Sequence, residues 1–244
     1  MSGIAERIEQ VRAEIAAACA KAGRSPVEVT LLAVSKTHPA AAVVEAIAAG
    51  VQHFGENRVE EARDKIPVVN ASASVPPIWH MIGHIQSRKA KDIPGLFQVV
   101  HSVDSLKLAE KLARLMAERG ESLDVLLEIN VSGEVSKSGL MAVNWSQDAA
   151  VRSALWASVG ELLALPGLRV RGLMTMAPIV DDMELARPVF ADLAALRLAL
   201  SESFDVTLPD LSMGMTDDYP VAIEEGATIV RVGRAIFGER QTIT

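Results

Sequence analysis

Short apolar runs alternate with amphipathic stretches along nearly the whole chain of 244 residues. Strict alternation of strand and helix is typical of a parallel sheet covered by helices. About eight such units in roughly 250 residues match the (β/α)8 TIM barrel. We therefore predict an α/β fold with one TIM barrel domain spanning residues 1–244. The predicted strands are residues 29–34, 53–55, 78–83, 99–103, 125–129, 170–176, 208–213 and 229–232.

An extra helix is expected before the first strand. Apolar residues from Ile4 to Ile15 recur at helical spacing with charges between them, and Gly23 can cap the helix that they form. A doubly wound open sheet is the competing fold, but Ser35–Pro39 stands where its glycine-rich nucleotide fingerprint would follow the first strand. An irregular insertion is predicted over Asn70–Pro77, which is rich in small residues and proline.

Composition narrows the classes of partner. The formal net charge of −7 argues against a general affinity for nucleic acid or for an anionic membrane. The single cysteine, Cys19, excludes an intrachain disulfide and a cysteine-rich metal site, and its alanine neighbours indicate a small core residue. Charges near the N-terminus leave no apolar signal region, so we expect a cytoplasmic protein.

Polar or flexible residues follow most of the predicted strands, where a barrel places its active site. Lys36 follows the first strand, and a lysine there is aimed at a ligand or at water. Gly214 and Gly233 follow the last two strands, where barrels often bind phosphate through backbone amides. Either glycine alone would indicate only a tight turn. An amine facing a phosphate cradle predicts pyridoxal phosphate held as a Schiff base.

Arg231 lies inside the last predicted strand, on the same face as Gly233, so its side chain can point into the barrel mouth. A buried arginine needs a partner. That partner is either a carboxylate, which would make the arginine structural, or a ring nitrogen of the ligand. A guanidinium facing the pyridine nitrogen would keep it unprotonated and weaken the cofactor as an electron sink.

A series of short motifs resembles the YggS/PROSC family of pyridoxal phosphate homeostasis proteins over nearly the whole chain. The motifs are Ala33-Val-Ser-Lys-Thr37, Phe54-Gly-Glu-Asn57, Trp79-His-Met-Ile-Gly83 with Gln86-Ser87, His101-Ser-Val-Asp104, Ser136-Lys-Ser-Gly139, Gly172-Leu-Met-Thr-Met176, Leu211-Ser-Met-Gly-Met215 and Arg231-Val-Gly233.

The resemblance implies a barrel related to the cofactor domain of alanine racemase, with Lys36 as the Schiff-base lysine. It also implies Arg231 at the pyridine nitrogen, Asn57 near the ring, and Ser212, Gly214 and Gly233 around the phosphate. The chain departs from the family pattern at His38, Arg88 and Arg234. The hydroxyl of a threonine is lost at Arg234, whose backbone N–H remains available for the phosphate and whose side chain could add charge by turning inward.

Other candidate residues carry weaker signals. His80, His84 and His101 lack the short spacing of a metal site and are expected at separate strand ends, in structural or ligand-edge roles, so no metal is predicted. Lys137 belongs to a motif of the family, but its chemistry alone indicates a solvated loop residue.

Two functions remain. In the first, the protein holds pyridoxal phosphate on Lys36 and buffers or delivers it to apoenzymes that use it, with no catalytic residues. In the second, it racemises an amino acid, which needs acid and base groups on both faces of the substrate carbon. The only tyrosine, Tyr219, is expected at a helix start, and the racemases' C-terminal domain is absent from this sequence. We therefore favour homeostasis, by a monomer. A phosphosugar enzyme would use the same phosphate loops but does not account for the motifs.

Overall fold

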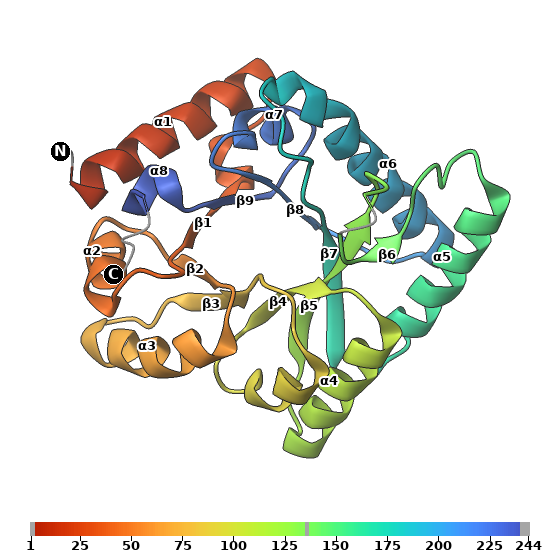
Figure 1. Cartoon of the computed structure of the whole chain (residues 1–244), viewed down its shortest axis with the longest axis horizontal. Coiled ribbons are helices and arrows are strands. Elements are labelled where there is room, and N and C mark those ends of the chain that lie inside the picture. Colours follow the sequence, from red (N-terminus) through yellow and green to blue (C-terminus); the bar gives the residue numbers. More distant parts are fainter. Residues whose placement is uncertain (1–2, 135–136, 240–244) are drawn as a thin grey trace.

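The computed structural model describes residues 3–134 and 137–239, and eight parallel strands form a closed ring within them (Figure 1). The strand order is β4-β3-β2-β1-β9-β8-β7-β5, and pairing of β4 with β5 closes the ring. Every predicted apolar run overlaps one strand of the ring, so the predicted barrel is confirmed. The strands are β1 (Thr30–Val34), β2 (His53–Glu56), β3 (Ile78–Met81), β4 (Val99–Val103), β5 (Leu123–Asn130), β7 (Leu168–Met174), β8 (Asp210–Met215) and β9 (Ile229–Val232).

Helices surround the ring and bury its outer face (Figure 1). They are α1 (Ile4–Lys21), α2 (Ala40–Ala48), α3 (Val59–Ser72), α4 (Leu106–Arg119), α5 (Ala149–Leu163), α6 (Arg187–Phe204), α7 (Tyr219–Glu224) and α8 (Arg234–Phe237), with short 3-10 turns at Pro26–Glu28, Ser87–Asp92 and Met183–Ala186. The main core lies between strands and helices, where Cys19 is fully buried as expected. Because both strand faces are covered, the strands read as continuous apolar runs.

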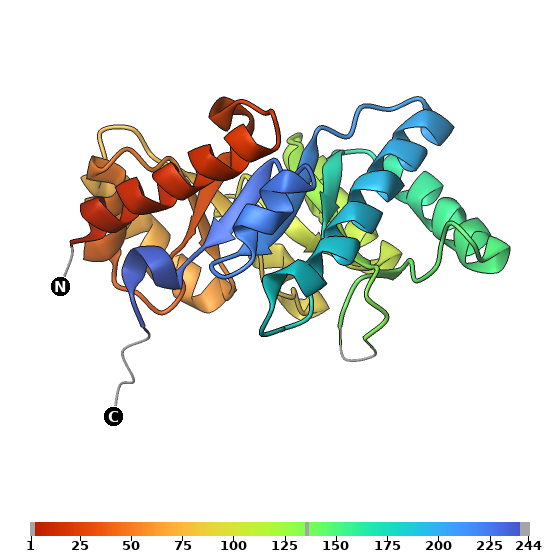
Figure 2. The same ribbon diagram turned by 90° about the horizontal axis from the view of Figure 1, so that it is seen from above.

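The N-terminal helix α1 covers the part of the barrel that the short last helix is too short to cover. Helix α8 has only four residues, and α1 lies beside it and beside α7 (Figure 2). Arg7 donates a hydrogen bond to the carbonyl of Ile236 at 2.5 Å, and Arg24 donates to the carbonyls of Ile223 and Ala227 at 2.8 and 2.9 Å. Both ends of the chain thus depend on each other for burial. Gly23, at φ +67°, follows the end of α1 as predicted.

Two details differ from the prediction. The expected insertion over Asn70–Pro77 is irregular only from Ala73 onward, because α3 continues through Ser72. A short ninth strand, β6 (Leu140–Met141), pairs with the end of β5.

Among the described residues, no helix is long and apolar enough to cross a membrane.

Gly172 tests the packing of the ring. A Cβ atom there would lie 1.8 Å from the carbonyl oxygen of Asp210 on the paired strand β8. Backbone atoms cannot yield as a side chain can, so Gly172→Ala should lower the free energy of unfolding by about 3 kcal/mol. In the control, Gly160→Ala, the new Cβ meets only the Phe204 ring, at 3.2 Å, and stability should change by less than about 1 kcal/mol. Urea denaturation compares the two; equal effects would contradict this account.

Candidate functional site

Four neighbouring strands bring most of the predicted site residues to one end of the barrel. Asn57, Lys36, Gly233 and Gly214 lie at or just beyond the carboxyl ends of β2, β1, β9 and β8, which are adjacent in that order. The register pairs Val34 with Gly55 in β2 and Ala33 with Val232 in β9. Residues far apart in sequence therefore share one mouth, at which barrels bind ligands.

The two glycines occupy their positions for different reasons. Gly214 has φ +88°, and a Cβ there would lie 2.7 Å from the Cβ of Ala222 in α7. Packing against α7 thus requires a glycine even without a ligand. Gly233 has an ordinary φ of −116°, and its N–H donates to the hydroxyl of Thr216 at 3.4 Å. The loops after the last two strands therefore meet, as the phosphate hypothesis requires.

Arg231 is a buried cation that contacts neutral groups. Its side chain crosses the barrel interior and donates to the hydroxyl of Ser212 at 2.7 Å and to the carbonyl of Thr175 at 2.9 Å, and the residue is only 5% exposed. Burial lowers its pKa to about 10, opposed by Asp218 and Glu128. It remains charged at neutral pH. Among the ion pairs of the described residues none involves Arg231, so the structural alternative, a paired carboxylate, is not what the barrel contains.

Arg234 pairs with carboxylates at the protein surface. Its guanidinium forms ion pairs with Asp217 and, at 3.7 Å, with Glu239, and its side chain is half exposed. An inward turn of this side chain, one of the possibilities for a phosphate contact, is not what the structure has. The backbone N–H of Arg234, at the start of α8, remains the predicted contribution of this residue.

Lys36 is partly buried. Two side chains of α3, Lys65 and Glu61, hold the backbone on either side of it. Lys65 donates to the carbonyl of Ser35 at 2.8 Å, and the N–H of Thr37 donates to Glu61 at 2.6 Å. Thr37 has φ +67°, a conformation that a threonine rarely adopts. These contacts orient the turn that carries Lys36.

These contacts belong to an ion triad in which Lys65 and Glu56 are buried and Glu61 is partly exposed. Lys65 lies 2.8 Å from Glu56 and 2.7 Å from Glu61, and Ser35 donates its hydroxyl to Glu56 at 2.7 Å. Burial raises the pKa of Glu56, and Lys65 opposes that rise. This triad was not predicted from the sequence, in which the available signal was the spacing of Glu61 and Lys65, which places both on one face of α3.

Loss of the central cation should be costly. Lys65→Met leaves the Glu56 carboxylate buried without its cation, and we expect the free energy of unfolding to fall by about 3 kcal/mol. Lys91→Met, at an exposed position, should change it by less than about 0.5 kcal/mol. Denaturant titration at pH 7 measures both. A Lys65→Met protein as stable as the control would mean that the triad does not stabilise the turn.

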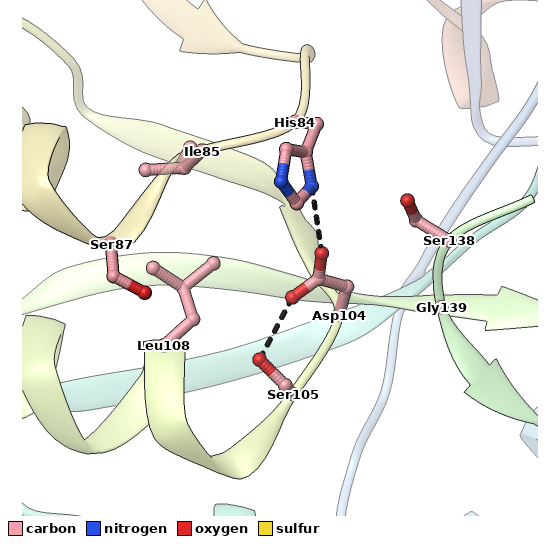
Figure 3. Close-up of a pocket in the computed structure, with 8 residues that line it drawn as sticks. All are labelled: His84, Ile85, Ser87, Asp104, Ser105, Leu108, Ser138 and Gly139. Carbon is pink, nitrogen blue, oxygen red and sulfur yellow. Dashed lines mark hydrogen bonds and ion pairs between the residues drawn. The ribbon is translucent and has the colours of Figure 1, made fainter.

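A pocket of about 310 Å³ opens beside the ends of β3, β4 and β5 (Figure 3). The imidazole Nδ1 of His84 lies 2.9 Å from Asp104, and Ser105 donates its hydroxyl to the other oxygen of that carboxylate at 2.9 Å. Ser138 and Gly139 lie on the opposite wall, and His84 is mostly exposed. The predicted ligand-edge role of His84 is compatible with this position.

Glu128 is a buried carboxyl close to this pocket. It lies on β5 and is 4% exposed; burial first, and then Asp104, raise its pKa to about 7, while His84 and Arg231 act in the opposite direction. A carboxyl with a raised pKa holds a proton in the folded state that the unfolded chain has already lost. Stability should therefore decrease as pH rises from about 4.5 to 7.

Glu128→Gln removes this titration. Its stability relative to the parent protein should increase by about 2 kcal/mol between pH 5 and pH 8, because the parent must ionise a buried carboxyl and the variant need not. Thermal and urea unfolding at both pH values measure the difference. Glu118→Gln, at an exposed position of α4, is the matched control and should show almost no pH-dependent difference. A constant difference for Glu128→Gln would contradict the raised pKa.

Lys137 differs from the expectation of a solvated loop residue. Its ammonium contacts Ser132 at 3.2 Å, Glu134 at 3.1 Å and the carbonyl of Met176 at 3.1 Å, and its side chain is 17% exposed. The loop after β5 is thereby tied to the end of β7. Ser136 of the same motif lies outside the described residues.

Two of the three histidines lie inside strands, so the expected separation at strand ends is wrong for them. His80 and His101 occupy the middle of β3 and β4, and Nδ1 of His80 lies 2.8 Å from Nε2 of His101. Side-chain alternation could have indicated this, because both positions share a face with inward residues of their strands. No group of three or more metal-ligating side chains forms a metal site among the described residues.

Known proteins and a protein family have sequences similar to this chain. The family described as alanine racemase, N-terminal domain, matches residues 7–241. The pyridoxal phosphate homeostasis protein of Pseudomonas aeruginosa is 46% identical over 240 residues, covering 98% of this chain and 97% of that protein. The protein of the same name from Escherichia coli K12 is 41% identical over 244 residues, with 98% coverage of both.

Solved structures show the same fold as this chain. PipY of Synechococcus elongatus with pyridoxal phosphate bound has a TM-score of 0.79 at 37% identity, covering 96% of this chain and all of that one. An alanine racemase of Clostridium difficile, at 13% identity and a TM-score of 0.72, shares the fold over 58% of its length. The fold and site thus define a barrel of the alanine racemase N-terminal-domain class. Within that class, the chain belongs to the family of pyridoxal phosphate homeostasis proteins.

Proposed function

We propose that this protein binds pyridoxal 5'-phosphate at the carboxyl end of the barrel and serves in its homeostasis, by buffering the cofactor and delivering it to apoenzymes. Lys36 is the amine with which the cofactor aldehyde condenses. The observation that carries the proposal is Arg231, a buried guanidinium whose hydrogen-bond acceptors among the described residues are neutral, on the strand next to the one that Lys36 follows.

The chemistry of the surrounding groups fits the cofactor. Bound pyridoxal phosphate supplies an aldehyde, an aromatic ring nitrogen and a phosphate dianion. A guanidinium only donates hydrogen bonds, so Arg231 suits an unprotonated ring nitrogen. The carboxamide oxygen of Asn57 is buried without a partner among the described residues, as is one carboxylate oxygen of Glu56. Ser212, Gly214, Gly233 and the N–H of Arg234 are the proposed phosphate contacts, and the hydroxyl of Ser212 also accepts from Arg231.

Racemisation is the less favoured function. Tyr219, the only tyrosine of the sequence, is buried at the start of α7 and donates its hydroxyl to Glu14 of α1, on the outside of the barrel. Burial and Glu14 raise its pKa, which further opposes a role as a base. The names of the relatives also describe homeostasis rather than catalysis. We therefore assign no catalytic residue.

The proposal is tested by loading the protein with pyridoxal phosphate. The wild type should turn yellow, and borohydride reduction followed by peptide mass analysis should locate the phosphopyridoxyl group on Lys36. Lys36→Ala should lose the absorbance but keep weak, phosphate-driven binding. Lys107→Ala, at an exposed position of α4, is the control and should load normally. A wild-type protein that takes up no cofactor would refute the proposal.

Racemisation is tested separately. Loaded protein is incubated with single L-amino acids, and D-isomers are measured by chiral chromatography. We expect less than one turnover per site, because Tyr219, the residue considered as a second base, is held by Glu14 on the outside of the barrel. Sustained turnover that disappears in Lys36→Ala would establish the racemase instead.

A further inference from the structure

Three histidines form a continuous hydrogen-bonded chain through the barrel interior. His53 Nδ1 lies 3.0 Å from His80 Nε2, His80 Nδ1 lies 2.8 Å from His101 Nε2, and His101 Nδ1 lies 2.8 Å from the hydroxyl of Ser212. The chain continues to Arg231, which donates to the same hydroxyl at 2.7 Å. It runs from the first residue of β2 to the middle of β8.

The two ends of the chain face different parts of the molecule. His53 and His80 line a cavity of about 490 Å³, whose wall also includes Thr30, Ile78 and Ile229, the first residues of their strands. That cavity lies at the amino ends of the strands, opposite the proposed cofactor site. Ser212 and Arg231, at the other end of the chain, belong to that site. The chain therefore joins two faces of the barrel.

All three rings are neutral at pH 7. Burial lowers the pKa of His53, lowers that of His80 to about 3, and lowers that of His101 well below 6.5. Each neutral imidazole has one N–H and one bare nitrogen, so it can donate through one side and accept through the other. Because each of the three contacts needs one proton, the tautomer of one ring determines the tautomers of the other two.

Only two arrangements satisfy all three contacts. In the first, every ring carries its proton on Nε2, and Ser212 donates its hydroxyl proton to His101. In the second, every ring carries its proton on Nδ1, and His101 donates to Ser212. Arg231 can only donate, so in the second arrangement Ser212 accepts twice and its own proton has no acceptor among these partners. A buried donor without an acceptor is unfavourable, which favours the first arrangement.

We propose that His53, His80 and His101 are positioning residues that hold one shared Nε2–H tautomer and thereby set the direction of the Ser212 hydroxyl beside Arg231. In the ligand-free protein, Ser212 then presents a lone pair, not a proton, to the proposed cofactor site. An acceptor placed against Ser212 would favour the other arrangement, and His53 would change from donor to acceptor at the far cavity. The inference concerns the ligand-free protein and does not require the proposed function.

Histidine NMR tests the proposal directly. Protein labelled with 15N-histidine and free of ligand is measured at pH 7, and long-range proton–nitrogen correlations identify the protonated nitrogen of each ring. Single His→Gln variants assign the five histidines. We expect Nε2–H for all three rings of the chain. A mixture of tautomers among them, or Nδ1–H in all three, would overturn the proposal.

Variants at the far end test the coupling. His53→Leu removes the acceptor of the His80 N–H, which penalises the first arrangement, so the nitrogen shifts of His101 should move toward the other tautomer although His101 does not contact His53. His53→Gln retains an acceptor and should restore the wild-type His101 shifts. Unchanged His101 shifts in folded His53→Leu would refute the coupling. If His53→Leu does not fold, the tautomers measured in the wild-type protein still test the proposal.

Discussion

Closure of the parallel sheet by the pairing of β4 with β5 is the constraint on which the rest of the structure depends. In a closed ring all carboxyl ends of the strands converge on one mouth, and inward side chains face each other across the interior. The strand that Lys36 follows and the strand that contains Arg231 are paired within this ring, although they lie near opposite ends of the sequence. Without closure, His101 on β4 could not reach Ser212 on β8. The ring therefore determines both the site and its interior connections.

The interior of the protein contains an apolar cluster and several buried ionisable groups. These groups are stabilised in different ways. Leu32, Leu126, Met174 and Ile229 form the apolar cluster. Arg231 keeps its charge and is solvated by a hydroxyl and a carbonyl, whereas the raised pKa of Glu128 allows that carboxyl to become neutral near pH 7. Lys65 forms ion pairs with two glutamates, Glu56 and Glu61. Buried ionisable groups persist only when they are paired, hydrogen-bonded or neutralised.

The eight strands and the N-terminal helix could be predicted because burial on both faces of a parallel strand leaves a continuous apolar run, and because helical periodicity is local. The alignment of Lys36, Asn57, Gly214 and Gly233 at one mouth followed from parallel topology alone. The hydrogen-bonding partners of the site residues could not be predicted in this way. The contact between Lys137 and the end of β7 depends on how two loops fold over each other, and the ion pair of Arg234 with Asp217 depends on how the loops after the last two strands meet.

The sequence by itself determined the barrel, the ends at which ligand chemistry belongs, and the family, because each of these is written in local patterns and ordered motifs. Only the tertiary structure decided which side chains touch. Strand register and closure place His53, His80 and His101 in one chain and place Lys65 beneath the turn of Lys36. These contacts depend on positions of a few ångströms between segments distant in sequence. Local periodicity in the sequence carries no information about such distances, whereas the packing of the closed ring fixes them.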